Sequence, residues 1–233
     1  MYWPMFDPIY YLFAIPALIL GLYAQYRVRS AYARFSRVGN TGGIVGYEAA
    51  QRLLAISGLG HVTLQEKPGH LSDHYDPRSK TLALSSGVAR SASVASLGIV
   101  AHEVGHAIQD HREYLPLKLR SGLVPVVRIG SWLGPIIFLG GMVLPIPNMS
   151  LIGLLFFSAT LVFSLVTLPV EFDASLRAVS MLQQRSGMMS GVDERGVQQV
   201  LSAASLTYVA AATQALSTIL YYVFLLGGYR RRD

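Results

Sequence analysis

The residues best suited to catalysis stand together as His102-Glu103-Val104-Gly105-His106. This HExxH motif lies in an apolar, helix-like run from Ser91 to Gln109. On a helix, residues four positions apart lie one turn apart on the same face, so both imidazoles can reach one metal ion. Glu103 projects about 100° around the helix from His102, where a carboxylate can act on water beside the metal. We therefore predict Zn²⁺ held by His102 and His106, with Glu103 as the general base, as in metalloprotease sites.

A catalytic zinc usually takes a third protein ligand and leaves one position for water. The extended motif HExxHxxGxxH would supply a third histidine. This chain has Gln109 in place of its glycine and Arg112 in place of its last histidine. His111 stands one position early, so we exclude it as the third ligand.

The stronger candidate is Glu171, which follows Pro169 directly after an apolar stretch. A carboxylate at a membrane boundary costs free energy unless it is paired or coordinates a metal. The alternative is an interfacial glutamate at a helix N-terminus, where negative charge is favourable without any metal. We favour Glu171 as the third zinc ligand.

Three other histidines, His61, His70 and His74, remain as candidates. His70 and His74 share a segment with Asp73 and Asp76. This segment suits either a second metal site or proton relay, or a tight turn whose aspartates cap backbone amides. We favour a structural or supporting role over direct zinc ligation.

The composition is that of a membrane protein. Hydrophobic residues make up 52% of the chain and charged residues 14%, with a mean hydropathy of +0.42; soluble proteins carry about 25% charged residues. The net charge is +6, but the arginines flank apolar segments and no basic run is interleaved with aromatics, which argues against nucleic acid. The absence of cysteine excludes disulfides and thiolate ligands.

Four apolar stretches approach the roughly 20 residues needed to cross a bilayer. They cover residues 9–26, 123–144, 151–168 and 206–226. The second contains Arg128, close enough to its start to snorkel to the interface. It also contains four glycines that suit close helix packing in lipid, namely Gly130, Gly134, Gly140 and Gly141.

These patterns predict a mainly α membrane protein with about four transmembrane helices and a small α+β zincin-like catalytic domain. Its predicted parts are an N-terminal anchor (1–26), a catalytic region (27–121), a transmembrane hairpin (122–169), a helical segment with the third ligand (170–203), and a last transmembrane helix with a basic tail (204–233). Within the catalytic region we predict a helix over 41–60, strands over 61–64 and 80–85, a turn-rich stretch over 71–78, and Ser91 or Ser93 as the cap of the HExxH helix.

The arginines favour a cytoplasmic catalytic side, because four of them follow the first span: Arg27, Arg29, Arg34 and Arg37. The hairpin of the second and third spans would return Glu171 to the side of the HExxH helix. If the fourth segment crosses fully, Arg230-Arg231-Arg232 would lie outside, against the same rule. Either the fourth segment does not cross simply, or the tail is an exception to the rule.

The chain resembles the YugP-like family of bacterial membrane zinc metallopeptidases over essentially its whole length. The resemblance rests on five segments: 73–77, 84–85, 101–109, 116–120 and 168–175. The relation of that family to other membrane gluzincins, such as the HtpX-like and CAAX prenyl proteases, implies Glu171 as the third ligand. Those relatives carry an ExxAD pattern. Here Ala174 matches, but Ser175 replaces the aspartate, and Asp173 would point to the other side of a helix.

We predict a zinc endopeptidase in the bacterial cytoplasmic membrane that cleaves membrane or membrane-associated proteins. The strand 81–85 could pair with an extended substrate, as edge strands do, and Arg120 and Arg177 are candidates to stabilise the oxyanion. One alternative is a zinc-binding scaffold or chaperone without turnover, against which the intact Glu103 argues. A transporter is a third class, but Arg128 alone makes a poor permeation path. The expected partners are a protein or peptide substrate and the lipid bilayer; the sequence leaves open a homo-oligomer or a membrane-protein partner.

Overall fold

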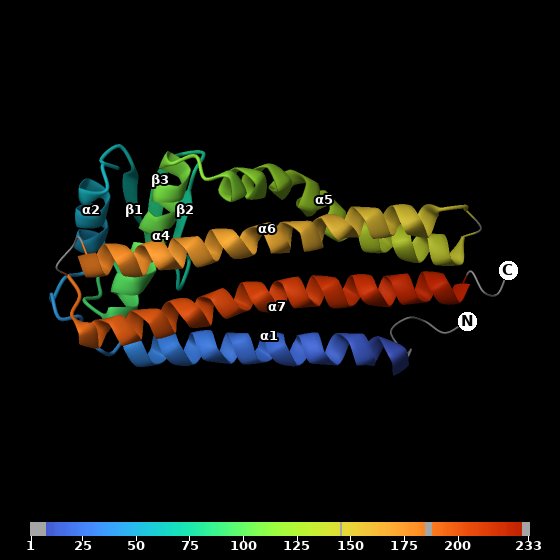
Figure 1. Ribbon diagram of the computed structural model, residues 1–233, viewed down its shortest axis with the longest axis horizontal. Helices are drawn as coiled ribbons and strands as arrows, with labels where there is room; N and C mark the ends of the chain where they lie inside the picture. Colours follow the sequence, from blue (N-terminus) through green and yellow to red (C-terminus); the bar gives the residue numbers. More distant parts are fainter. Residues whose placement is uncertain (1–7, 145, 185–187, 230–233) are drawn as a thin grey trace. The chain divides into compact units, whose positions relative to one another are not determined.

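The computed structural model describes residues 8–144, 146–184 and 188–229. In chain order, its elements are α1 (Pro8–Phe35), α2 (Gly46–Ile56), β1 (Thr63–Lys67), β2 (His74–Asp76), β3 (Thr81–Ser85), α3 (Ser86–Ala89), α4 (Val94–His111), α5 (Leu115–Val143), α6 (Met149–Gln184) and α7 (Gly191–Tyr229) (Figure 1). The prediction of a mainly helical chain with a small sheet is confirmed.

The chain divides into two compact units. The first, here called the helical unit, consists of Met1–Ala24, Leu119–Leu168 and Thr207–Asp233. The second, here called the mixed unit, consists of Gln25–Lys118 and Pro169–Leu206 and holds the sheet and the HExxH helix.

The helical unit has the surface of a membrane protein. The helices α1, α5, α6 and α7 are long and apolar enough to cross a bilayer, as predicted. On this unit, Leu12, Trp132 and Leu155 are 74, 70 and 64% exposed. Large apolar side chains exposed in such numbers are stable in lipid rather than in water. The arginines at 230–232, which raised the question of orientation, lie outside the described residues.

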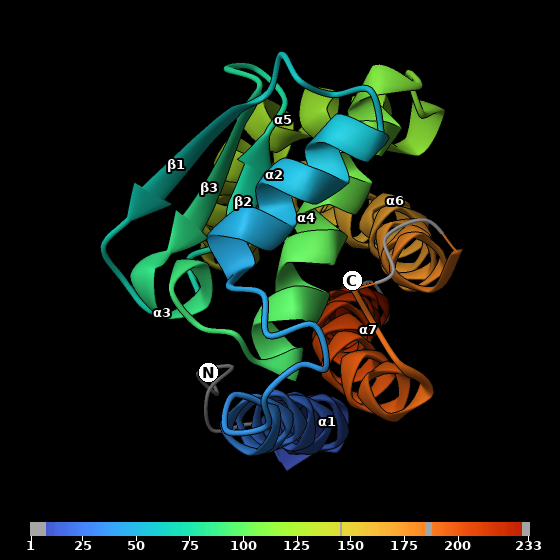
Figure 2. The ribbon, with the colours of Figure 1, turned by 90° about the vertical axis from the view of Figure 1, so that its left-hand side faces the viewer.

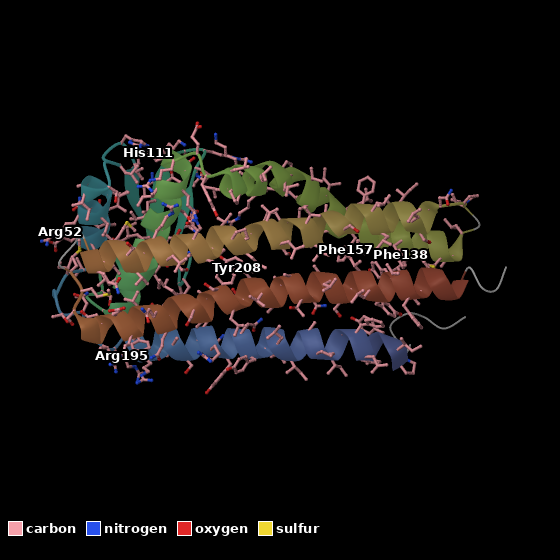
Figure 3. All side chains as sticks on the ribbon, viewed as in Figure 1. Arg52, His111, Phe138, Phe157, Arg195 and Tyr208 are labelled. Atoms are coloured by element: carbon pink, nitrogen blue, oxygen red, sulfur yellow. The ribbon has the colours of Figure 1, made fainter. Side chains whose placement is uncertain are left out.

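Glycines bring α5 and α6 together within the helical unit, as the sequence predicted. A Cβ added at Gly134 would lie 2.8 Å from the backbone nitrogen of Phe157, so no larger residue fits there without a shift. Phe138, labelled with Phe157 in Figure 3, is fully buried and stacks on Tyr222 with ring centroids 4.0 Å apart. Small residues thus allow α5 and α6 to approach and large aromatic side chains to fill the space beside them.

The sheet of the mixed unit has the strand order β1-β3-β2, with β1 parallel and β2 antiparallel to β3 (Figure 2). The central strand β3 is buried at Leu82, Ala83 and Leu84. The prediction that residues 81–85 offer an edge for substrate is therefore wrong, because neighbouring strands pair with β3 on both sides. The edge strand that contacts α4 is β2, which lies in the stretch predicted as turns.

The start of one helix and the continuity of another matter for the site. The HExxH helix α4 begins after Ser93, whose hydroxyl accepts a hydrogen bond from the amide of Ser96 at 3.2 Å, so one of the two predicted caps is correct. The helix α6 runs through Pro169 without a break. Glu171 thus lies inside a helix, and the alternative of a glutamate at a helix N-terminus is wrong.

Candidate metal centre

The helix α4 presents both histidines of the motif on one face. Its neighbouring residues Val100, Ala101 and Val104 are fully buried in the core of the mixed unit, which fixes the rotation of the helix about its axis. The rings of His102 and His106 lie edge to face, with centroids 4.7 Å apart and planes at 85°. One turn of helix thus places the two rings beside each other, as the spacing predicts.

Glu171 from α6 meets these two rings. Its Oε2 atom lies 3.2 Å from Nε2 of His102 and 3.6 Å from Nε2 of His106, and its side chain is only 2% exposed. The predicted return of Glu171 to the HExxH helix is thereby confirmed. A buried carboxylate beside two imidazoles is an arrangement that favours a cation.

The spacing of the three groups fits zinc. Nitrogen and oxygen ligands bound at about 2.0–2.1 Å in a tetrahedral arrangement lie about 3.4 Å apart. The distances from Glu171 Oε2 to the two histidine nitrogens are close to this value, and ligand atoms of all three residues lie within 4.8 Å of one another. Among the residues that the structure describes, this is the only group of three or more such side chains able to hold a metal ion.

The other ring nitrogens of the two histidines have partners of their own. Nδ1 of His102 lies 3.2 Å from Oγ of Ser175, and Nδ1 of His106 lies 3.0 Å from Oε1 of Gln109. Both Nε2 atoms are thereby directed toward Glu171. Histidines that ligate metals commonly bond a protein group through the second nitrogen in this way.

Glu103 is held beside the group by the sheet. Its Oε2 atom accepts a hydrogen bond from the backbone amide of Tyr75 in β2 at 2.9 Å. The side chain is largely buried, so its carboxylate has little access to bulk water. The bond from the Tyr75 amide uses one of the two carboxylate oxygens and so orients the carboxylate.

Two contacts tie Asp110 of α4 to β2 and to the residue that precedes β3. The hydroxyl of Tyr75 donates to Oδ2 of Asp110 at 2.6 Å, and Nζ of Lys80 donates to the same oxygen at 2.6 Å. Burial raises the pKa of the Tyr75 hydroxyl, and the bond to Asp110 raises it further. The phenol therefore remains a donor over the whole physiological pH range.

The aspartates on either side of Tyr75 accept hydrogen bonds from nearby backbone and hydroxyl groups. Asp73 accepts hydrogen bonds from the amide and hydroxyl of Ser85, and Asp76 accepts one from the amide of Arg78 at 2.9 Å. These hydrogen bonds are of the kind that the favoured structural role predicts. The bond from the Arg78 amide and a second one from the Ser79 hydroxyl hold the pKa of Asp76 below its usual value, because they favour the charged form.

The remaining candidate residues lie in other contacts. His74 bonds the carbonyl of Ser72, His70 packs edge to face on Tyr32, and His61 lies beside His111. None of these four histidines belongs to the metal-binding group found among the described residues. Arg177, one of the two candidates for the oxyanion, donates through Nε to Asp173 at 2.6 Å.

The electrostatics of the centre favour positive charge. Burial by itself lowers the pKa of the His106 imidazole, but the hydrogen bond with Glu171 and the negative charge of Glu103 outweigh burial, so the pKa is raised. Negative charge that stabilises a protonated imidazole also attracts a metal cation.

The surroundings of His106 were not predicted. In the sequence, Gln109 stands out only as a departure from a longer zinc motif. A signal was nevertheless present, since a glutamine three residues after a histidine lies on the same helix face.

The comparisons with known proteins agree with this geometry. Residues 10–227 match the family described as "Putative neutral zinc metallopeptidase". The chain is also 42% identical over 211 residues to "Putative membrane protease YugP" of Bacillus subtilis (strain 168), covering 91% of this chain and 93% of that protein. No solved structure matches. Zinc is the cofactor that the family and the His-His-Glu group both indicate.

Proposed function

Since the chain belongs to this zinc metallopeptidase family, we propose that it is a membrane-embedded zinc endopeptidase that cleaves membrane or membrane-associated proteins. The observation that carries the proposal is the convergence of His102 Nε2, His106 Nε2 and Glu171 Oε2. The negative charge of Glu103 also acts on His106. Three nitrogen and oxygen ligands leave one position of a tetrahedral zinc open, as catalytic sites require.

His102, His106 and Glu171 would hold the metal, and Glu103 would carry the proton. Zinc bound there would lower the pKa of water and polarise the scissile carbonyl as a Lewis acid. Glu103 would accept the proton of the attacking water and deliver it to the leaving amine. The amide of Tyr75 orients the Glu103 carboxylate for this transfer, because it bonds one of its two oxygens.

We place the substrate at β2 rather than at β3. An extended peptide can add to an exposed strand edge through backbone hydrogen bonds. Among the strands, β2 is the edge that contacts α4, and its central residue Tyr75 bonds Glu103. A peptide along β2 would therefore lie next to the proposed base.

We further propose that the mixed unit faces the cytoplasm of a bacterial cell. Support comes from the arginines at 27, 29, 34 and 37, which follow the first apolar span. Positive residues beside a span favour the cytoplasmic side.

Cleavage of a casein-type substrate by the purified full-length protein tests the proposal. Glu103→Gln should keep its zinc but lose activity by about 10²- to 10⁴-fold, because an amide cannot accept the proton. Glu171→Gln should instead weaken zinc binding, since it removes a charged ligand. Glu48→Gln, an exposed residue paired with Arg52 in α2, is the matched control.

Two outcomes would count against the peptidase. Cleavage by Glu103→Gln at the parental rate would show that Glu103 is not the base. A parent that binds proteins but cleaves none would favour a zinc-binding scaffold. If the proposal holds, proteomics of cells with Glu103→Gln should reveal accumulated substrates.

A further inference from the structure

Gln109 forms a buried link between the second histidine of the motif and α6. Its side chain is fully buried, although an amide in the core costs free energy unless its hydrogen bonds are made. Three are made: Oε1 meets Nδ1 of His106 at 3.0 Å, while Nε2 donates to the carbonyl of Val170 at 2.8 Å and to Oδ2 of Asp173 at 2.7 Å.

These partners determine which way the amide points. The carbonyl of Val170 and the carboxylate of Asp173 can only accept, so the nitrogen of Gln109, which carries two hydrogens, must face them. The oxygen of Gln109 must then face His106. Because that oxygen only accepts, Nδ1 of His106 must carry the hydrogen, and the lone pair of the neutral ring lies on Nε2. Nε2 is the atom directed toward Glu171.

Asp173 is itself held in place. Nε of Arg177, one turn further along α6, donates to the same Oδ2 atom at 2.6 Å. The order of contacts is thus His106, Gln109, Asp173, Arg177, and it joins α4 to α6. Asp173 touches the centre through Gln109 rather than directly.

At its Nδ1 atom the other histidine, His102, has no partner among the described residues that selects one tautomer. Nδ1 of His102 faces the hydroxyl of Ser175, which can donate or accept. A hydroxyl does not select one tautomer of the ring, so the surroundings of the two histidines differ in kind.

We propose that Gln109, backed by Asp173 and Arg177, is a positioning residue that selects the Nδ1-protonated tautomer of His106 and aims its Nε2 at zinc. The inference rests on the proposed function for the identity of the metal. It adds a role for three residues outside the His-His-Glu group.

The test compares three variants of the full-length protein. Gln109→Leu removes the acceptor at similar volume and should weaken zinc binding about 10- to 100-fold, the usual effect of losing such a partner. Asp173→Asn should have a smaller effect. The exchanged pair, Gln109→Glu combined with Asp173→Asn, keeps an acceptor at His106, a donor at position 173 and the same total charge, but it loses the donor to the Val170 carbonyl. It should therefore bind zinc more tightly than Gln109→Leu and more weakly than the parent.

Two readouts separate positioning from a merely structural role. Zinc dissociation constants come from competition with a chelator. ¹⁵N NMR of the zinc-free protein, at a pH alkaline enough to keep the ring neutral, reports the tautomer of His106. The parent and the exchanged pair should show hydrogen on Nδ1, and Gln109→Leu should lose that preference. Gln51→Leu, an exposed glutamine in α2, controls for the substitution itself.

A parental zinc affinity or an unchanged tautomer in Gln109→Leu would overturn the inference. So would an exchanged pair that is as impaired as Gln109→Leu. If Gln109→Leu does not fold, Asp173→Asn and the exchanged pair still decide the question. A parent that binds no zinc would refute the proposed function, while its NMR spectrum would still test the tautomer.

Discussion

Gly105 in α4 lies directly against the backbone of Ala174 in α6. A Cβ built on Gly105 would be 2.7 Å from the carbonyl oxygen of Ala174 and 3.2 Å from its Cα. Gly105 stands between the two histidines of the motif, and Ala174 stands three residues after Glu171. The contact between these two small residues therefore sets how closely Glu171 approaches the histidines.

Gly105→Ala should damage the metal centre. The added methyl meets backbone atoms, which cannot move aside as a flexible side chain could, and overpacking of this kind costs about 1–3 kcal/mol. We expect a lower unfolding temperature and weaker zinc binding, measured by thermal unfolding and chelator competition. In Gly98→Ala on the same helix, the new Cβ would meet Val197 at 3.4 Å, an ordinary contact. That control should keep its zinc, and equal loss in both variants would contradict the argument.

Zinc content should depend on the three converging side chains. The purified protein should hold about one zinc per chain, since three nitrogen and oxygen ligands make one catalytic site. His102→Ala and His106→Ala should each lose most of it by elemental analysis. His111→Ala is the matched control, because this exposed histidine ends the same helix. Full zinc in both ligand variants would rule out the assignment.

Tyr75→Phe should loosen β2 without emptying the metal centre. The change removes the hydrogen bond to Asp110, and a bond to a charged group contributes about 1.5–3 kcal/mol. Stability should fall and peptide cleavage should slow, because the amide of the same residue orients Glu103. Zinc content should not change. Tyr47→Phe, on a half-exposed tyrosine of α2, should leave stability and cleavage at parental values.

Orientation in the membrane can be measured cleanly because the chain has no cysteine. We expect a membrane-impermeant maleimide to label Ile146→Cys, between α5 and α6, from outside the cell. Gln51→Cys in α2 should react only after permeabilisation, since the arginines after the first span favour a cytoplasmic mixed unit. The reverse pattern of labelling would overturn this orientation.

Features that depend on local geometry could be predicted from the sequence. The spacing of His102 and His106 requires one helix face, and four apolar stretches have the length to cross a bilayer. Ser93 as a helix cap follows from side-chain chemistry within three residues. Each of these depends on neighbours along the chain, so periodicity and residue type were sufficient.

Beyond the predicted meeting of Glu171 with the histidines, the contacts between distant residues became known only from the tertiary structure. Pro169 suggested a boundary, yet α6 continues through it and carries Glu171 to the histidines. The strand 81–85 was correctly predicted, but its central place in the sheet depends on β1 and β2, which pair across loops. Gln109 reaches Asp173 only because α4 and α6 cross closely at Gly105. Such contacts depend on how helices pack, and no local pattern of residues encodes the partner that each side chain will find.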